Sequence, residues 1–163
     1  MNQSTRFKCV LPPANLLLIY TLMLATSCTD HVLPQPNYNL DVILRGAGKM
    51  SGFIKFQQFS DRAATIFLDT SVQGLEPNTK YMLQRAVDTN LDGNCTSSSW
   101  LTLGKELVPQ AILTDNVGSG SEALFRGVAA IPSGSTFDIH FQIVNQATSA
   151  VVLTSDCYQY TVR

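Results

Sequence analysis

Histidine is scarce in this sequence, because only His31 and His140 occur among 163 residues. Hydrolytic nucleophiles are commonly activated by a neighbouring histidine, and redox copper needs a set of imidazole ligands. Lysine and arginine form no run or patch, whereas phosphate backbones are bound by clustered positive charge. The sequence therefore contains no histidine-based catalytic set and excludes nucleic acid as a partner.

Long apolar runs are absent except for residues 16–25 (LLLIYTLMLA). That run is shorter than the ~20 apolar residues that a membrane-spanning helix needs. Arg6 and Lys8 precede it in a segment without acidic residues, and small residues follow it. This order predicts a secretory signal peptide over residues 1–27.

The end of the signal, residues 24–28 (LATSC), resembles the lipobox of bacterial lipoproteins, whose cysteine is diacylated and becomes the first residue. The resemblance predicts a lipid on Cys28, and so attachment of the exported chain to a membrane of the bacterial cell envelope. A second interpretation is ordinary cleavage after Ser27, because residues 25–27 also fit a small-x-small cleavage site.

The number of cysteines favours the lipid. Removal of the signal peptide takes Cys9 away and leaves Cys28, Cys95 and Cys157. An odd cysteine in an exported protein needs an explanation. A lipid on Cys28 supplies one, and it leaves Cys95 and Cys157 to pair in an oxidising compartment.

The exported part divides into a tether and one domain. Residues 28–38 are polar and include Pro34 and Pro36, which predicts an extended tether. Residues 39–163 have the length of a single domain. All 12 acidic residues but only 9 of the 11 basic ones lie beyond residue 27, so the exported part has a net charge of −3.

Alternation of apolar and polar residues runs through most of this domain, and no segment of it has a sustained helical period. Val, Ile, Thr, Tyr and Phe dominate the alternating segments, as half-buried strands require. Turn residues such as Gly46, Gly93 and Pro132 separate them. The pattern predicts an all-β, antiparallel sandwich or flattened barrel of seven to eight strands, with strands in residues 40–44, 54–56, 64–72, 81–87, 137–143 and 149–162.

Four motifs in this order resemble copper/zinc superoxide dismutases. Residues 42–58 (VILRGAGKMSGFIKFQQ) are similar to that family's opening hairpin, and residues 72–75 (VQGL) to its turn before the first metal-binding strand. Cys95 in NCTSSS and Cys157 in SDCYQYTVR stand where the family has its disulfide cysteines. The resemblance implies an eight-stranded Greek-key barrel with a Cys95–Cys157 bridge.

The metal ligands of that family are largely missing here. Its first histidine pair falls on Met82 and Gln84, or on Leu83 and Arg85 if the register shifts by one residue, and the alternation favours the first register. No histidine follows Cys95 in the loop, and only His140 matches a late copper ligand. The resemblance therefore implies the fold without dismutase activity, and we predict that the protein is not an enzyme.

Two metal sites are alternatives to a purely binding or structural role. Residues 88–93 (DTNLDG) fit the start of a calcium loop, with oxygen ligands from Asp88, Asn90 and Asp92 and a sharp turn at Gly93. The twelfth position of that loop is Ser99 instead of the usual glutamate, and a polar turn is the simpler interpretation.

The second metal site is Cu(I) held by Met82 and His140, since a thioether with an imidazole suits that ion. The preferred interpretation remains a lipid-anchored envelope domain that binds no redox metal. Its partners, besides the membrane, would be an envelope protein or a glycan.

Overall fold

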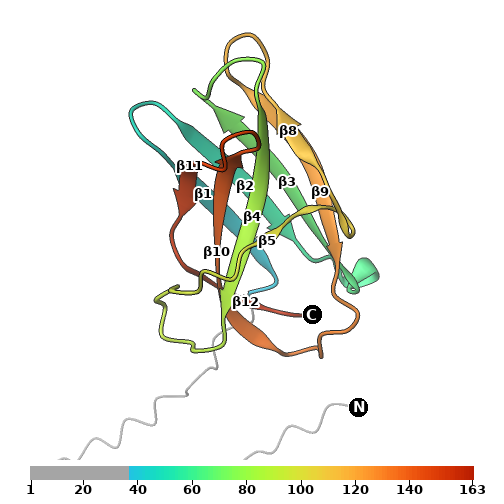
Figure 1. Cartoon of the computed structure of the whole chain (residues 1–163). Coiled ribbons are helices and arrows are strands. Elements are labelled where there is room, and N and C mark those ends of the chain that lie inside the picture. The colour runs from blue at the N-terminus through green and yellow to red at the C-terminus, as the bar shows by residue number, and fades with distance from the viewer. Residues whose placement is uncertain (1–36) are drawn as a thin grey trace, which may run out of the picture. The chain divides into compact units, whose positions relative to one another are not determined.

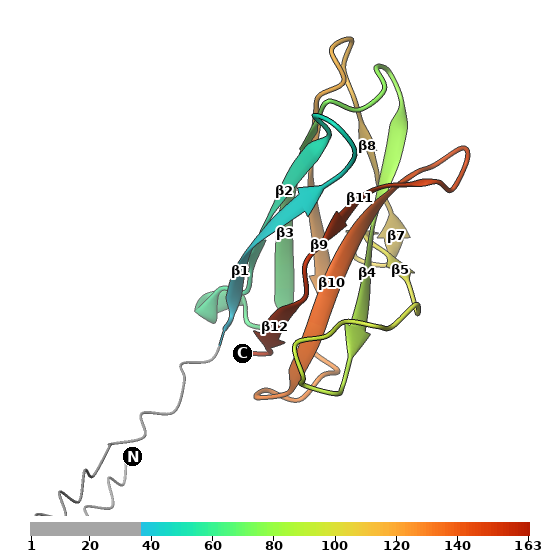
Figure 2. The same ribbon diagram turned by 90° about the vertical axis from the view of Figure 1, so that its left-hand side faces the viewer.

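The computed structural model describes residues 37–163, which form an all-β domain (Figures 1 and 2). The predicted signal peptide, Cys28 and the tether up to residue 36 lie outside the described residues. Helical structure in the described part is limited to the short 3-10 turn η1 (Ser60–Arg62). None of the helices in residues 37–163 is long and apolar enough to cross a membrane.

Three long strands at the start of the domain form an antiparallel meander: β1 (Asn39–Arg45), β2 (Ser51–Gln57) and β3 (Thr65–Gln73). Val42 pairs with Ile54, and Ile54 pairs with Thr70, so the inward residues of the three strands lie side by side. The remaining strands are β4 (Lys80–Asp88), β5 (Leu101–Thr102), β6 (Gly104–Lys105), β7 (Val108–Pro109), β8 (Ala111–Leu113), β9 (Gly120–Gly127), β10 (Thr136–Asn145), β11 (Val151–Ser155) and β12 (Tyr158–Thr161).

The strands join into one sheet that curls into a nearly closed barrel. Its order is β5-β4-β10-β11-β1-β2-β3-β9-β6-β7, with β8 paired to β4 and β12 paired to β10. All pairings are antiparallel except that of β6 with β9. Because β3 pairs with β9 and β1 with β11, the chain crosses between strands that are distant in sequence.

The barrel wall is interrupted between β4 and β9, which share no ladder in the described part of the chain. β8 fills one end of this gap. Next to it, residues 101–106, here called the strap, cross from one strand to the other. The Leu103 amide donates to the Leu83 carbonyl at 2.8 Å, and the Glu106 amide donates to the Phe125 carbonyl at 3.0 Å. Beyond the strap, toward the ends of β4 and β9, neither element covers the gap.

The core follows from the alternation seen in the sequence. Val42, Leu44, Ile54, Leu83 and Ile143 are fully buried inward residues of four strands, β1, β2, β4 and β10. The predicted all-β, antiparallel class is therefore confirmed. The prediction of seven to eight strands was too low, because the sheet has twelve strand segments. The surplus arises from two-residue pairings around the strap and from a break that divides the last strand into β11 and β12.

A disulfide joins Cys95, in the loop after β4, to Cys157, between β11 and β12. The S–S distance is 2.04 Å and the Cα atoms are 5.4 Å apart. The predicted pairing is confirmed. Structural disulfides persist in oxidising compartments, so this bridge indicates a location outside the cytoplasm.

We expect the Cys95→Ser, Cys157→Ser double variant to lower the free energy of unfolding by about 2–4 kcal/mol, because the bridge closes a long loop in the unfolded chain. Urea unfolding of the oxidised protein and of the variant measures the difference. The reduced wild type should match the variant. Equal stability of all three forms would show that the bridge does not stabilise the fold.

A buried glutamine, Gln58, ties the end of β2 to the end of the chain. Its side chain is fully buried, and its Oε1 accepts hydrogen bonds from the Tyr160 hydroxyl and the Arg163 amide, both at 2.7 Å. Its Nε2 donates to the Ala63 carbonyl. Burial raises the pKa of Tyr160, so the phenol stays protonated as a donor.

We expect Gln58→Leu to lower the free energy of unfolding by about 2–3 kcal/mol, because it leaves the buried Tyr160 hydroxyl without its acceptor. Chemical denaturation measures this change. Gln73→Leu is the matched control, since Gln73 is exposed on β3 and, among residues 37–163, its side chain bonds only to the Ser51 hydroxyl, at 2.9 Å. An equal loss in both variants would contradict the role given to Gln58.

Candidate functional site

The loop after β4 begins at Asp88, the first residue of the predicted calcium loop. The Asp88 carboxylate accepts hydrogen bonds from the Ser97 amide at 3.1 Å and from the Thr96 hydroxyl at 3.3 Å. These donors come from the far side of the same loop. Asp88 therefore fastens residues 96–97 back onto the end of β4.

The other two predicted calcium ligands bond to each other and to the loop. Asn90 Nδ2 donates to Asp92 Oδ2 at 2.5 Å, and the Asn94 amide donates to Asp92 Oδ1 at 2.9 Å. Gly93 has a φ of 73°, as a tight turn requires. Among residues 37–163, no three side chains of His, Cys, Asp or Glu are gathered so that they could hold an ion. Calcium binding at this loop stays a prediction.

Asp138 is an acidic residue of this region that the sequence analysis missed. It lies on β10 directly opposite Asp88 on β4, and it is 1% exposed. Its Oδ2 accepts the Gly93 amide at 2.7 Å, whereas its Oδ1 has no hydrogen-bond partner in the described part of the chain. Asp138 thus holds the turn of the loop against the barrel.

His140 lies on the outer face of β10 and contacts the same loop. Its Nε2 is 3.1 Å from the Ser97 carbonyl oxygen, so this nitrogen donates the hydrogen bond. The Trp100 ring covers the imidazole, with 4.6 Å between the ring centroids. His140 is therefore bonded through one nitrogen and stacked on an aromatic ring.

Met82 and His140 are not brought together. Met82 pairs with Val144 in the β4–β10 ladder, whereas His140 pairs with Ala86. An offset of four residues along a strand corresponds to roughly 13 Å. The two groups proposed as Cu(I) ligands are thus too far apart to share an ion.

A cavity of about 360 Å³ opens at the uncovered part of the gap between β4 and β9. Apolar side chains from both sides of the barrel line it, among them Phe56, Leu68, Leu103, Phe137 and Ile139. Val128 and Ile131, in the connection from β9 to β10, also line it. The cavity therefore continues the hydrophobic core toward one end of the barrel.

The charged residues lining this cavity are Arg85 and Arg126. Arg85 follows Leu83 at the next inward position of β4. Arg126 follows Leu124 at the next inward position of β9 and pairs with Ile66. Both arginines therefore occupy positions where alternation would place an apolar residue. Both are half-buried.

No carboxylate neutralises either arginine within residues 37–163. The ion pairs there are Arg45–Asp156, Arg62–Asp61 and Lys105–Glu122. Arg126 Nη1 donates to the backbone carbonyl of Glu106 at 3.3 Å, while the Glu106 carboxylate accepts the Gly127 amide at 3.2 Å. The cavity wall therefore holds two positive charges without a matching acid.

The two charges also influence each other. Burial, and secondly the positive charge of Arg126, lower the pKa of the Arg85 guanidinium from its usual value. An arginine stays protonated at neutral pH even so, because its unperturbed pKa is far above that range. Both guanidinium groups that line the cavity therefore stay positively charged at physiological pH.

The arginine pair left a weak signal in the sequence. In KYMLQRAV, Tyr81, Leu83 and Val87 alternate as inward residues, and Arg85 interrupts them. In EALFRG, Arg126 stands two residues after Leu124. Either arginine alone is unremarkable, and only the barrel shows that both face one cavity.

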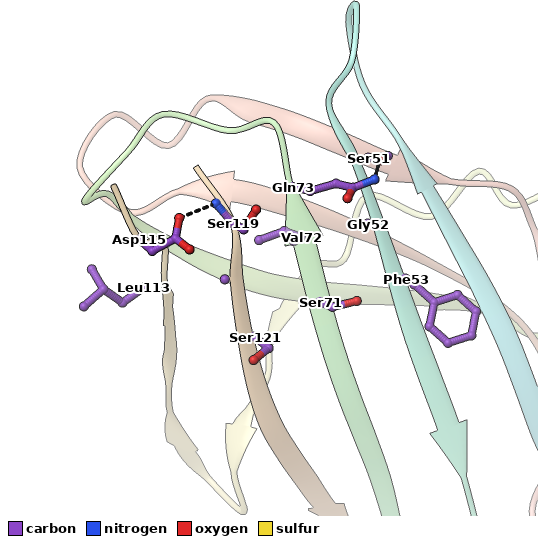
Figure 3. Close-up of a pocket in the computed structure, with 11 residues that line it drawn as sticks. Ser51, Gly52, Phe53, Ser71, Val72, Gln73, Leu113, Asp115, Ser119 and Ser121 are labelled. Atoms are coloured by element: carbon purple, nitrogen blue, oxygen red, sulfur yellow. Dashed lines mark hydrogen bonds between the residues drawn. The ribbon is translucent and has the colours of Figure 1, made fainter. Parts of the chain in front are cut away.

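A second depression lies on the outer surface over β2, β3 and β9 (Figure 3). Ser51, Ser71 and Ser121 line it, with the exposed Phe53 ring at one side. Its acid, Asp115, accepts the amides of Ser119 and Val117, each at 2.9 Å, and these bonds lower the Asp115 pKa. This depression is open and polar, and its one carboxylate bonds to its own turn.

No protein-family model matches this sequence, and no curated protein aligns with it significantly.

We expect Arg85→Met to raise the free energy of unfolding by about 1 kcal/mol, because it removes a half-buried, unpaired charge and its repulsion with Arg126. Urea unfolding measures the change. Arg62→Met is the control, since Arg62 is exposed on η1 and lies outside the cavity. A marked loss of stability in Arg85→Met would mean that the arginine has an unrecognised stabilising partner.

Proposed function

We propose that this protein is an exported lipoprotein of the bacterial cell envelope whose β-domain acts by binding and not by catalysis. The apolar cavity with its two arginines is the main support. It is a concave, mostly apolar site with a few polar groups, and its volume of about 360 Å³ lies within the usual range for small-molecule sites. An arginine pair with no base or nucleophile beside it can attract a ligand but has no means of transferring a proton.

We infer that the domain has the Greek-key arrangement of superoxide dismutase-like barrels. The support is the strand order, in which the β1-β2-β3 meander continues to β9, while β4 is joined through β10 and β11 back to β1. The disulfide adds support, since it links the loop after β4 to the last strand region, as the resemblance implies. Fold likeness alone assigns no activity.

The absence of dismutase activity is likewise our inference. Gln84, at one expected histidine position, donates to the Thr102 hydroxyl at 3.1 Å and accepts from Gln142 at 2.7 Å. Met82, at the other, is 9% exposed. A carboxamide held between two hydrogen-bonded neighbours and a thioether packed against the barrel wall do not form a redox copper site.

We expect the purified exported protein, dialysed against trace copper, zinc and calcium, to hold less than stoichiometric copper and zinc by elemental analysis. Superoxide turnover should equal that of the buffer, also after Met82→His with Gln84→His, because the loop still lacks ligands. A strong gain of activity in that double variant would contradict our inference. Stoichiometric calcium that is lost on Asp88→Ala and Asp92→Ala would instead establish the loop as an ion site.

The anchor is tested separately. We expect the wild type, expressed in a bacterial host, to sediment with membranes and to have the mass of a diacylated Cys28. Cys28→Ser should appear in the soluble exported fraction without the added mass, while Cys9→Ser should behave as the wild type. Cleavage after Ser27 without lipid would favour the second interpretation of the signal.

A further inference from the structure

The unpaired arginines need an explanation other than packing. Arginine stems do cover apolar surface while their heads reach water, and a purely structural role would use only the stems. Another cation near the gap, Lys105 of the strap, does have an acidic partner. Its Nζ lies 3.0 Å from Glu122 Oε1 of β9. Arg85 and Arg126 receive no such partner within residues 37–163.

Two like charges facing one apolar space are costly unless an anion joins them. Burial and mutual repulsion both disfavour the charged form of Arg85. A guanidinium matches a carboxylate in shape, and it forms strong, short hydrogen bonds with it. An anionic group placed between the two arginines would therefore remove the repulsion and complete the hydrogen bonding of both.

The apolar part of the cavity determines the size and polarity of the rest of the ligand. The same cavity is lined by the apolar rings and chains of Phe56, Leu68, Ile139 and Tyr160. At ~30 Å³ per water molecule, about 360 Å³ holds roughly a dozen waters, and so a ligand of about a dozen heavy atoms. That is the size of one medium-length alkyl chain with its head group, and too small for a two-chain phospholipid.

We propose that this cavity binds a single-chain amphipathic carboxylate, such as a medium-chain fatty acid, with its head group between Arg85 and Arg126 and its tail in the apolar interior. The proposal rests on the binding function proposed above and names its ligand class. Burial of the tail supplies the affinity, and the arginine pair selects the anion over a neutral molecule of the same length.

Isothermal titration with decanoate and with decanol tests the ligand class. The protein is the exported full chain with Cys28→Ser, which needs no detergent that would compete for the site. We expect decanoate to bind with one-to-one stoichiometry and decanol to bind about tenfold to a hundredfold more weakly. Amide NMR shifts on binding should centre on Val128, Phe137 and Ile139.

Point variants distinguish the contribution of the arginine charges to binding from that of the cavity shape. Arg85→Met and Arg126→Met should each weaken decanoate by about tenfold or more and leave decanol nearly unchanged. Arg62→Met should alter neither. Ala130→Phe, at the cavity rim, should weaken both ligands alike. Thermal unfolding of each variant without ligand shows that it is folded.

Three results would overturn the proposal, and they differ in what else they reject. Equal affinity for decanol and decanoate, unchanged by Arg85→Met, would reject the ligand class and leave the binding function intact. NMR shifts confined to the outer depression of Figure 3 would reject the cavity as the site. Failure of both ligands to bind, with no shift at the cavity residues, would reject the binding function as well.

Discussion

The missing ladder between β4 and β9 is the constraint on which the rest of this domain depends. A closed barrel would pair these strands along their whole length and fill its interior with side chains. Here β8 and the strap cover only part of the gap, and each bonds to the strands through a few backbone groups. The uncovered remainder becomes the cavity, and inward positions of both bordering strands are occupied by arginine. Architecture and candidate site therefore have the same origin.

Much of the fold could be predicted because alternation reports burial directly. In β1, β3 and β10 the inward residues are apolar except Thr70 and the final Asn145, and the strands are seven to ten residues long, so the pattern is clear. The strap and β8 were missed because pairings of two or three residues leave no periodic trace. β9 was also missed, since Glu122 and Arg126 stand at its inward positions and break the apolar pattern.

The candidate site was harder to predict than the fold, because it joins residues that are distant in the chain. Arg85 and Arg126 face one cavity only because β3 pairs with β9 and the wall stops there. The Cu(I) prediction took Met82 and His140 from the ligand positions of the resembled family, and such a match does not report the register between the strands of this chain. Met82 and His140 have the side-chain types of a soft-metal ligand pair, yet they lie four ladder positions apart. The loop of Asp88 likewise resembles an ion loop because turns and ion loops favour the same residues.

The strap also affects the tendency of the protein to associate with other copies of itself. An interrupted barrel exposes strand edges, and free edges invite edge-to-edge association and aggregation. Here the strap and β8 occupy part of the edges of β4 and β9, and one end of the strand order is β7, which is two residues long and finishes at Pro109. Proline has no amide hydrogen to offer a further strand. The short strands around the strap thus end the sheet beside the cavity, and they leave little free edge on which a second chain could pair.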